Sequence, residues 1–510
     1  MYQIFSLKKN HIVLFEIFII FLLLHLVYQL GYYGLRSGDS YVDFDFFKII
    51  LNNHKFRLGT DMMTGWPLIH IFSSTISMLT KIEPLSIAKI VPSFISSLIV
   101  LPLYLFVHSI YNNKRIALLS CLIFGSVPQF VNFTALFVRE TFAIYFFVLF
   151  VFILYIAKKR EEYRLKFLLL FLIPIIILSH HFTSFLLIIF LTIFMFFSKL
   201  IPYIYRKKYE QQKFSKINIT TFYFIILTSL FIYWVYITTF IFNDFSSIFF
   251  EIIGEKEFIS YSGKINLGAP IVTLQGNIIF YGFFLFNGII CLVLLMKFLA
   301  HKTKNIIEET SCTMFLYFCF FSGFLSLFFL GSIIYPDRFI PFGLLFGIIP
   351  LIVFLFSAKK PITKKILFLI IVAFLIFNIY NIDTKYYTGK ASQDGEVCTE
   401  KEYAIAETIN VPDIYYGYSG VSQAIYDVQR VDFMHGRKDP ISITTDFFDI
   451  SNIAIINEGM YLRYLEYTKI KSLITYDRLI TVLSYKNLND INKISDLGDI
   501  YILEWNTNYE

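Results

Sequence analysis

Residues 12–30, IVLFEIFIIFLLLHLVYQL, form the stretch that decides the fold class. A helix that crosses a bilayer needs roughly 20 mostly apolar residues, and this run has that length. It is too long for the core of a signal peptide and lacks a clean small-x-small cleavage site, so we expect a retained signal anchor. Similar runs follow, and about eleven candidate spans meet the same criterion. They begin near Ile12, Pro84, Ile116, Thr141, Leu165, Phe182, Ile219, Asn277, Ser311, Phe339 and Ile366.

The composition excludes a water-soluble fold. Of the 510 residues, 57% are hydrophobic and 16% are charged, whereas soluble domains carry about 25% charged residues. The sequence therefore predicts a polytopic α-helical membrane protein. The net charge of +7 lies in short basic clusters between apolar runs, which is typical of a topology signal and predicts no nucleic-acid partner. The five cysteines show neither metal-ligand spacing nor a disulfide framework.

The lysines and arginines also predict the orientation. With Lys8 and Lys9 in the cytoplasm, alternate loops collect the basic clusters, as the positive-inside rule requires. An odd number of spans then leaves the C-terminus outside the plasma membrane. If the short apolar stretch 66–79 crossed the bilayer, all later loops would change sides and the basic clusters would no longer follow the positive-inside rule. We therefore expect this stretch to form an outer juxtamembrane or re-entrant helix.

The composition divides the chain into two predicted domains. Residues 1–385 hold the predicted spans, with a long polar first outer loop at 32–66. Residues 386–510 alternate helical stretches with short β-like runs, which predicts a small C-terminal α/β domain on the extracytoplasmic side. The β-like runs lie at 413–416, 453–456, 472–476 and 499–503.

Polar residues near the membrane plane are candidates for function, because the bilayer interior excludes unpaired charge. Under the predicted topology, the conspicuous ones all lie at outer ends of spans or in outer loops. Because they all lie on the same side of the membrane, they favour a functional site at its outer surface. They are Asp39, Asp43, Asp45, Lys89, Arg139, Glu140, His180, His181, Asp337 and Arg338.

Several of these residues also have a purely structural interpretation. Asp39 and Asp43 are four positions apart, so on one helix they would share a face and suit metal binding or a catalytic base. Acidic residues there, like Glu140 at the start of its apolar run, are equally typical of helix N-termini. The pair His180 and His181 lies in a tight turn between apolar runs. Two interpretations stay open for it: contact with a phosphate, or ordinary packing with satisfied hydrogen bonds.

Arg338 lies at the predicted outer rim, where an arginine either snorkels or clamps a phosphate. The sequence contains no Walker loop, GxGxxG fingerprint, HExxH motif or nucleophile elbow, which weighs against ATPases, nucleotide-cofactor enzymes and metalloproteases. The predicted spans carry almost no charge, and this disfavours ion-coupled transport.

The order of these motifs resembles the GT-C superfamily of membrane glycosyltransferases, which use lipid-linked sugar donors. GDSYVD at 38–43 is similar to the acidic motif of the family's first outer loop, and VRET at 138–141 is similar to its second acidic motif. SHHFTS at 179–184 resembles a histidine-pair segment of archaeal relatives. The Trp-Trp-Asp-Tyr-Gly motif of sequon-reading oligosaccharyltransferases is absent.

The resemblance implies an inverting transfer of a sugar from a polyprenyl-phosphate donor to a glycan, lipid or protein acceptor among the membrane lipids. It implies that Asp39 is the catalytic residue, and that Asp39 and Glu140 are ligands of any divalent cation, Mg or Mn. Arg338 matches the family's phosphate-contacting arginine. The implied substrate-binding positions are Asp43, Lys89, Arg139, Glu140, His180, His181 and Arg338.

Two other classes of function stay open. A lipid-linked glycan transporter or scaffold without catalysis would share the rim chemistry but need a polar groove across the membrane. An outer-face acyl- or phosphotransferase would use the histidine pair as its base, so His180→Ala would abolish its activity while Asp39→Asn would be mild.

Overall fold

The fold is that of a computed structural model. It describes residues 10–30, 34–35, 38–56, 65–160, 162–204, 219–239, 241–242, 274–299 and 340–357, helical positions between 365 and 376, and strand residues 415–417, 437–438, 453–457, 491–496 and 500–505. The chain forms two compact units. The larger comprises residues 1–28 and 46–383, and the smaller comprises residues 29–45 and 384–510.

Three helices in the described part of the chain are long and apolar enough to cross a membrane. They are α2 (Asn10–Leu30), the continuous run of α5 (Pro84–Leu98) and α6 (Val100–Tyr111), and α9 (Arg139–Arg160). Each begins within a few residues of a predicted span, which confirms that apolar run length locates these helices. The total of about eleven spans stays a prediction.

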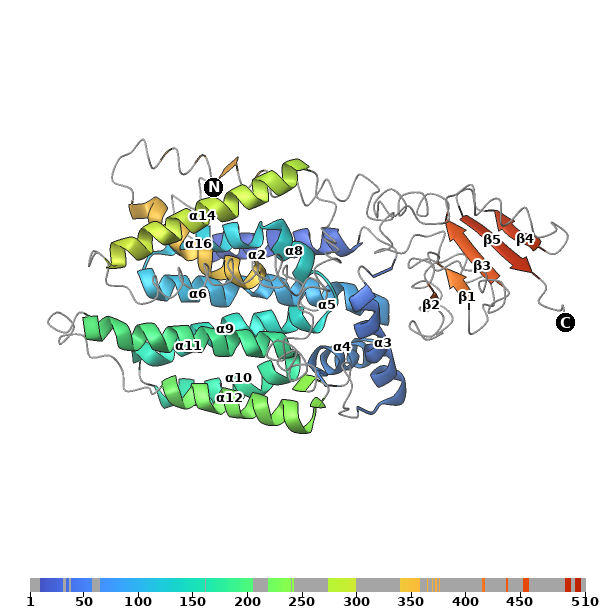
Figure 1. The fold of residues 1–510 in the computed structure, drawn as a ribbon, viewed down its shortest axis with the longest axis horizontal. Helices are drawn as coiled ribbons and strands as arrows, with labels where there is room; N and C mark the ends of the chain where they lie inside the picture. The colour runs from blue at the N-terminus through green and yellow to red at the C-terminus, as the bar shows by residue number, and fades with distance from the viewer. Residues whose placement is uncertain are drawn as a thin grey trace, which may run out of the picture. The chain divides into compact units, whose positions relative to one another are not determined.

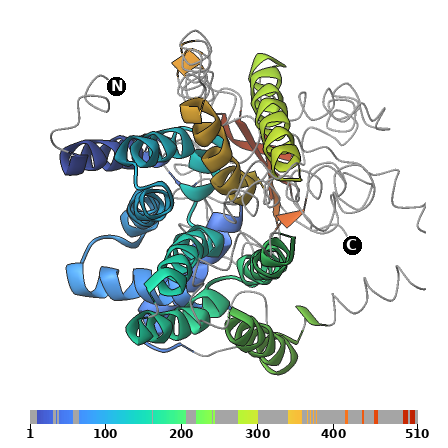
Figure 2. The same ribbon diagram turned by 90° about the vertical axis from the view of Figure 1, so that its left-hand side faces the viewer.

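Helices α9, α10 (Tyr163–Ser179), α11 (His181–Ile204) and α12 (Ile219–Tyr236) pack side by side in the larger unit, as Figures 1 and 2 show. Helices α7 (Lys114–Gly125) and α14 (Leu274–Leu299) each pack against α16 (Ile340–Ser357). Aromatic rings fill this interior. The rings of Phe190 and Phe346 stack with centroids 5.4 Å apart, and Phe147 meets Phe342 edge-on at 5.2 Å. Such pairs add about 0.5–1.5 kcal/mol each beyond their burial.

Two asparagines build the turn between α6 and α7. Asn112 ends α6 in the left-handed conformation (φ 49°), which asparagine tolerates better than most residues. The side chain of Asn113 accepts hydrogen bonds from the backbone amides of Arg115 and Ile116, at 2.9 and 3.2 Å. These bonds satisfy amides that have no partner inside a helix. The dipeptide therefore fixes where one apolar helix ends and the next begins.

Helix α2 approaches α7 closely at Gly125. A Cβ atom added to this glycine would overlap the ring of Phe21, whose side chain is itself 1% exposed. The absence of a side chain at Gly125 thus makes room for the phenyl ring. This contact is part of the core of the larger unit.

Most of the buried residues of helix α4 (Leu68–Thr80) are polar. His70, Ser73 and Ser74 are each 0% exposed, whereas Leu79 is 79% exposed. The 13 residues of α4 fall well short of the roughly 20 that a span requires. This agrees with the predicted juxtamembrane or re-entrant helix at 66–79, whose side of the membrane stays a prediction.

The described strands of the smaller unit form one sheet with the order β2-β1-β3-β5-β4. Strand β1 (Tyr415–Gly417) pairs in parallel with β2 (Arg437–Lys438) and β3 (Ile453–Asn457). Strand β5 (Ile500–Trp505) pairs antiparallel with β3 and β4 (Ile491–Asp496). Strands are therefore present at the runs predicted near 413, 453 and 499, while 472–476 lies outside the described residues. The α/β domain and its side of the membrane stay predictions.

Candidate functional site

Trp66 lies at the centre of a group of the predicted site residues. Its side chain is fully buried, at 0% exposed, just before α4. The guanidinium carbon of Arg139 lies 5.9 Å from the centre of the indole ring. The centre of the His181 ring lies 4.5 Å from the indole, with the two planes inclined by 44°. The indole thus links the first residue of α9 to the first residue of α11.

His180 joins the same group through its neighbour, because the centres of the His180 and His181 rings are 4.6 Å apart. His180 has an extended backbone between α10 and α11. The backbone amide of Thr183 donates to Nδ1 of His180 at 3.4 Å, and the Thr183 hydroxyl lies 3.2 Å from the same atom. His180 therefore caps the N-terminus of α11. Since Nδ1 accepts, the proton of the neutral ring is on Nε2, which is a hydrogen-bond donor.

Arg139 and Glu140 begin α9. Glu140 is buried, at 4% exposed, and Arg139 is half-buried. The hydroxyl of Thr141 donates to the carbonyl oxygen of Leu136 at 2.9 Å, and the Thr141 amide donates to that of Val138 at 3.1 Å. The first turn of α9 is therefore fixed to the residues before it.

The backbone next to Trp66 is held by α12. The hydroxyl of Tyr233 donates a hydrogen bond to the carbonyl oxygen of Gly65. On the other side, Pro67 immediately precedes α4. Trp66 therefore lies between a residue hydrogen-bonded to α12 and the N-cap of α4.

We call Trp66, Arg139, His180 and His181 the tryptophan cluster. Helices α9 and α11, 22 and 24 residues long, both begin in it. The N-terminus of a helix carries roughly half a positive charge, and its free amides favour anions. The planar guanidinium fork of arginine matches phosphate oxygens. The tryptophan cluster is therefore suited to bind an anionic group.

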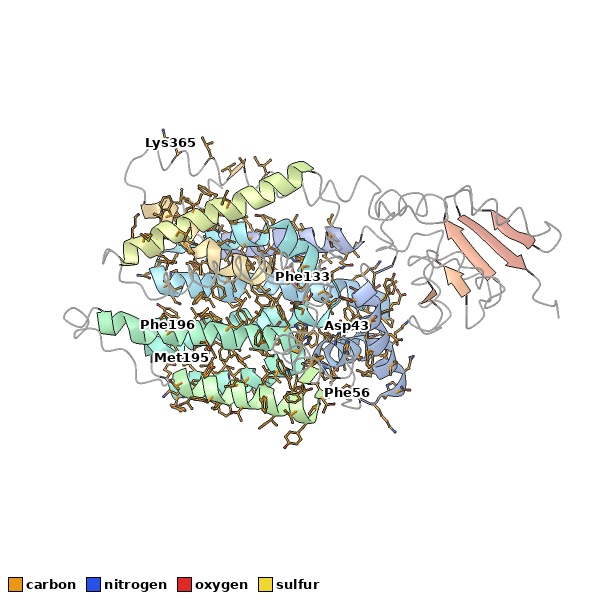
Figure 3. The ribbon with its side chains drawn as sticks, in the orientation of Figure 1. Asp43, Phe56, Phe133, Met195, Phe196 and Lys365 are labelled. Carbon is orange, nitrogen blue, oxygen red and sulfur yellow. The ribbon has the colours of Figure 1, made fainter. Side chains whose placement is uncertain are left out.

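The acidic motif of the first outer loop lies on α3 (Gly38–Asn53). The helix begins before Asp39, so Asp39 and Asp43 are both helical and one turn apart. Their surroundings differ, because Asp39 is exposed while Asp43, labelled in Figure 3, is 1% exposed. Asp45 is half-buried. These three residues belong to the smaller unit, and their roles stay predictions.

Lys89 lies on α5 and is 8% exposed. Its predicted phosphate contact stays a prediction, as does that of Arg338, which together with Asp337 lies outside the described residues. Among the residues that the structure describes, no group of three His, Cys, Asp or Glu side chains could hold a metal ion. The divalent cation therefore also stays a prediction.

Sequence reasoning singled out Arg139, His180 and His181, and the structure brings these three together. It missed Trp66 as a site residue. The available signal was weak: Trp66 is one of three tryptophans in the chain, and it stands between Gly65 and Pro67 at the start of a short apolar stretch.

No protein-family model matches the chain, and no curated protein matches its sequence. Among solved structures, the chain is similar to the crystal structure of ArnT from Cupriavidus metallidurans bound to undecaprenyl phosphate. The similarity covers 97% of this chain and 98% of that chain, with a TM-score of 0.52 and 9% sequence identity. Such a likeness shows the fold alone. The chain therefore shares the overall fold of that structure, and this fold and its apolar helices indicate a membrane location.

Proposed function

We propose that this protein is a membrane glycosyltransferase, which transfers a sugar from a polyprenyl-phosphate donor to an extracytoplasmic acceptor. The observation that carries the proposal is the tryptophan cluster at the start of two long helices, where Arg139 and His181 lie against one buried indole and His180 lies against His181. The shared fold supports it, because the ArnT structure contains undecaprenyl phosphate.

The tryptophan cluster would bind the phosphate of the donor. The Arg139 guanidinium would contact two phosphate oxygens, and the Nε2 donor of His180 would contact a third. Lys89 and Arg338 would add positive charge. These groups favour the reaction because they stabilise the negative charge that grows on the phosphate as it leaves.

Asp39 would act as the general base of the transfer. Its carboxylate accepts the proton of the acceptor hydroxyl, whose oxygen forms a bond to the anomeric carbon. The bond between that carbon and the phosphate oxygen breaks, and its electron pair leaves with the polyprenyl phosphate. Attack from the face opposite the leaving group inverts the anomeric configuration. Asp43 and Glu140 would orient the acceptor or hold a divalent cation.

The test is sugar transfer by the purified protein in lipid nanodiscs, from a panel of radiolabelled polyprenyl-phosphate sugars to an envelope extract. Asp39→Asn and Arg139→Ala are compared with wild type. Arg164→Ala is the matched control, because Arg164 is an exposed arginine in the first turn of α10. Folding of each variant is checked by thermal unfolding.

We expect transfer by wild type and by Arg164→Ala, and none above background by Asp39→Asn or Arg139→Ala. A folded Asp39→Asn variant with full activity would refute Asp39 as the base. Transfer of an acyl or phosphoryl group in place of the sugar, abolished in His180→Ala and only mildly affected in Asp39→Asn, would favour the acyl- or phosphotransferase. In closed lipid vesicles, movement of a labelled donor across the bilayer without sugar transfer would favour the transporter.

A further inference from the structure

A histidine inside the first membrane helix is hydrogen-bonded to a distant part of the chain. On α2, Nδ1 of His25 lies 2.8 Å from the carbonyl oxygen of Phe21, and Nε2 lies 3.0 Å from the hydroxyl oxygen of Thr134. The side chains of His25 and Thr134 are both 0% exposed. A buried polar side chain in a bilayer-spanning helix is a candidate for function, and the proposed transfer does not use this one.

The hydrogen-bond partners of His25 determine which of its ring nitrogens carries a proton. The Phe21 carbonyl can only accept, so Nδ1 of His25 carries a proton. In the neutral ring, Nε2 then accepts the hydrogen of the Thr134 hydroxyl. That hydroxyl also lies 2.7 Å from the carbonyl oxygen of Phe130, so two acceptors share its one hydrogen. The ring of His25 further meets Phe130 edge-on, with centroids 6.0 Å apart.

Thr134 is held from a second helix as well. It is the last residue of α8 (Pro128–Thr134), the short helix on which Figure 3 labels Phe133. The hydroxyl of Ser96, on α5, donates to the carbonyl oxygen of Thr134 at 2.6 Å. Thus His25 of α2 holds the side chain of Thr134, and Ser96 of α5 holds its backbone.

Residues 135–138, which are mostly buried, connect Thr134 to Arg139. Among them, Ala135, Phe137 and Val138 are 0, 0 and 8% exposed. The amide of Val138 donates to the carbonyl oxygen of Leu136 at 2.9 Å, and the hydrogen bonds of Thr141 described above tie these residues to α9. Residues 135–138 thus form a compact, hydrogen-bonded connection between Thr134 and the first turn of α9.

We propose that His25 and Ser96 are positioning residues, which hold Thr134 so that Arg139 keeps its place beside Trp66. This inference rests on the proposed function insofar as Arg139 binds the donor phosphate. A misplacement of about 1 Å can cost a hundredfold in rate. Loss of either hydrogen bond should therefore impair donor binding although neither residue touches the donor.

Two substitutions each keep one of the two hydrogen bonds of His25 and remove the other. In His25→Gln the side-chain amide can reach the position of Nε2, so the bond to Thr134 is kept. In His25→Asn the shorter amide reaches only the position of Nδ1, so only the bond within α2 is kept. Ser96→Ala removes the second tie, and His11→Gln is the control because His11 is an exposed histidine of the same helix.

The first readout is the fluorescence of Trp66 in a Trp234→Phe, Trp505→Phe background, which leaves it as the one tryptophan. Arg139→Ala in this background sets the reference for a displaced guanidinium. We expect His25→Asn and Ser96→Ala to shift the emission in the same direction as Arg139→Ala, and His25→Gln and His11→Gln to match wild type. If His25→Asn and Ser96→Ala both match wild type, the proposal is wrong, whatever the transfer assay gives.

The second readout is the kinetics of transfer. We expect His25→Asn to raise the KM for the donor about 10- to 100-fold, with a smaller change in kcat. A purely structural role would lower the active fraction, and hence kcat, at unchanged KM, and would overturn the proposal. If wild type transfers no sugar, the glycosyltransferase assignment fails, while the Trp66 emission still decides the role of His25 and Ser96.

Discussion

The imidazole of His181 lies 4.5 Å from the indole of Trp66, with the ring planes inclined by 44°. Since the same indole lies 5.9 Å from the guanidinium carbon of Arg139, one apolar side chain sets the spacing of two groups that can carry positive charge. A fully buried aromatic side chain can hold such groups more rigidly than another long polar side chain could. The predictions below begin from this arrangement.

Replacement of Trp66 by phenylalanine should loosen this spacing, because the smaller ring cannot contact both Arg139 and His181. We expect kcat/KM for the donor to fall roughly tenfold or more. The measurement is steady-state transfer at varied donor concentration. Trp234→Phe, which changes a mostly buried tryptophan of α12, is the control. An equal effect of both substitutions would show that general packing, and not the tryptophan cluster, is responsible.

Replacement of Arg139 by lysine tests the guanidinium fork. Lysine keeps the charge but cannot make two parallel hydrogen bonds to one phosphate. We expect undecaprenyl phosphate, added as a competitive inhibitor, to bind about tenfold more weakly to Arg139→Lys, since hydrogen bonds to charged groups contribute roughly 1.5–3 kcal/mol. Arg164→Lys should bind it like wild type. Unchanged inhibition of Arg139→Lys would contradict a two-point contact.

His180 combines a structural role with a proposed functional one, and two substitutions distinguish them. His180→Asn keeps a side-chain acceptor for the Thr183 amide, whereas His180→Ala removes it and should lower the free energy of unfolding by about 1 kcal/mol. Both variants lose the Nε2 donor. We therefore expect both to bind the donor more weakly, while only the alanine variant is less stable. Full activity of a stable His180→Asn variant would show that the histidine serves the helix alone.

The contact between Gly125 and Phe21 predicts an effect on stability. Gly125→Ala should destabilise the protein by about 1–3 kcal/mol, because the added methyl group overlaps the phenyl ring. Gly288→Ala is the matched control, since a Cβ atom there meets nothing within 4 Å, and alanine in a helix stabilises by about 0.5–1 kcal/mol relative to glycine. Thermal unfolding in one detergent checks both. Phe21→Leu should restore part of the stability of Gly125→Ala.

The sequence predicted the long helices well, because the thickness of the bilayer demands long apolar runs and few other structures need them. It placed the start of α9 near Thr141, two residues beyond the observed start at Arg139. The reason is that Arg139 and Glu140 interrupt the apolar pattern although they are helical. The apolar run at 66–79 is too short to cross, and α4 is accordingly 13 residues long, while its juxtamembrane or re-entrant placement stays a prediction.

The candidate site was only partly predictable. Arg139 and the histidine pair were conspicuous as polar residues beside apolar runs, but no local pattern shows that Trp66 would lie between them. His25 was hidden within residues 12–30, and its partner Thr134 is 109 positions away in sequence. Contacts of this kind depend on how the helices pack, which periodicity and run length do not specify.

The buried serines of α4 have a consequence for how its sequence can vary. In a soluble protein, the inward face of a helix tolerates only apolar side chains of the right size and the outward face tolerates nearly any polar one. On α4, we expect positions 73 and 74 to accept only small side chains, and Leu79 to be freely exchanged among Ile, Val, Met and Phe but not for Glu. A saturation library scored for expression would thus give a tolerance profile for this helix that is the mirror image of the profile of a soluble one.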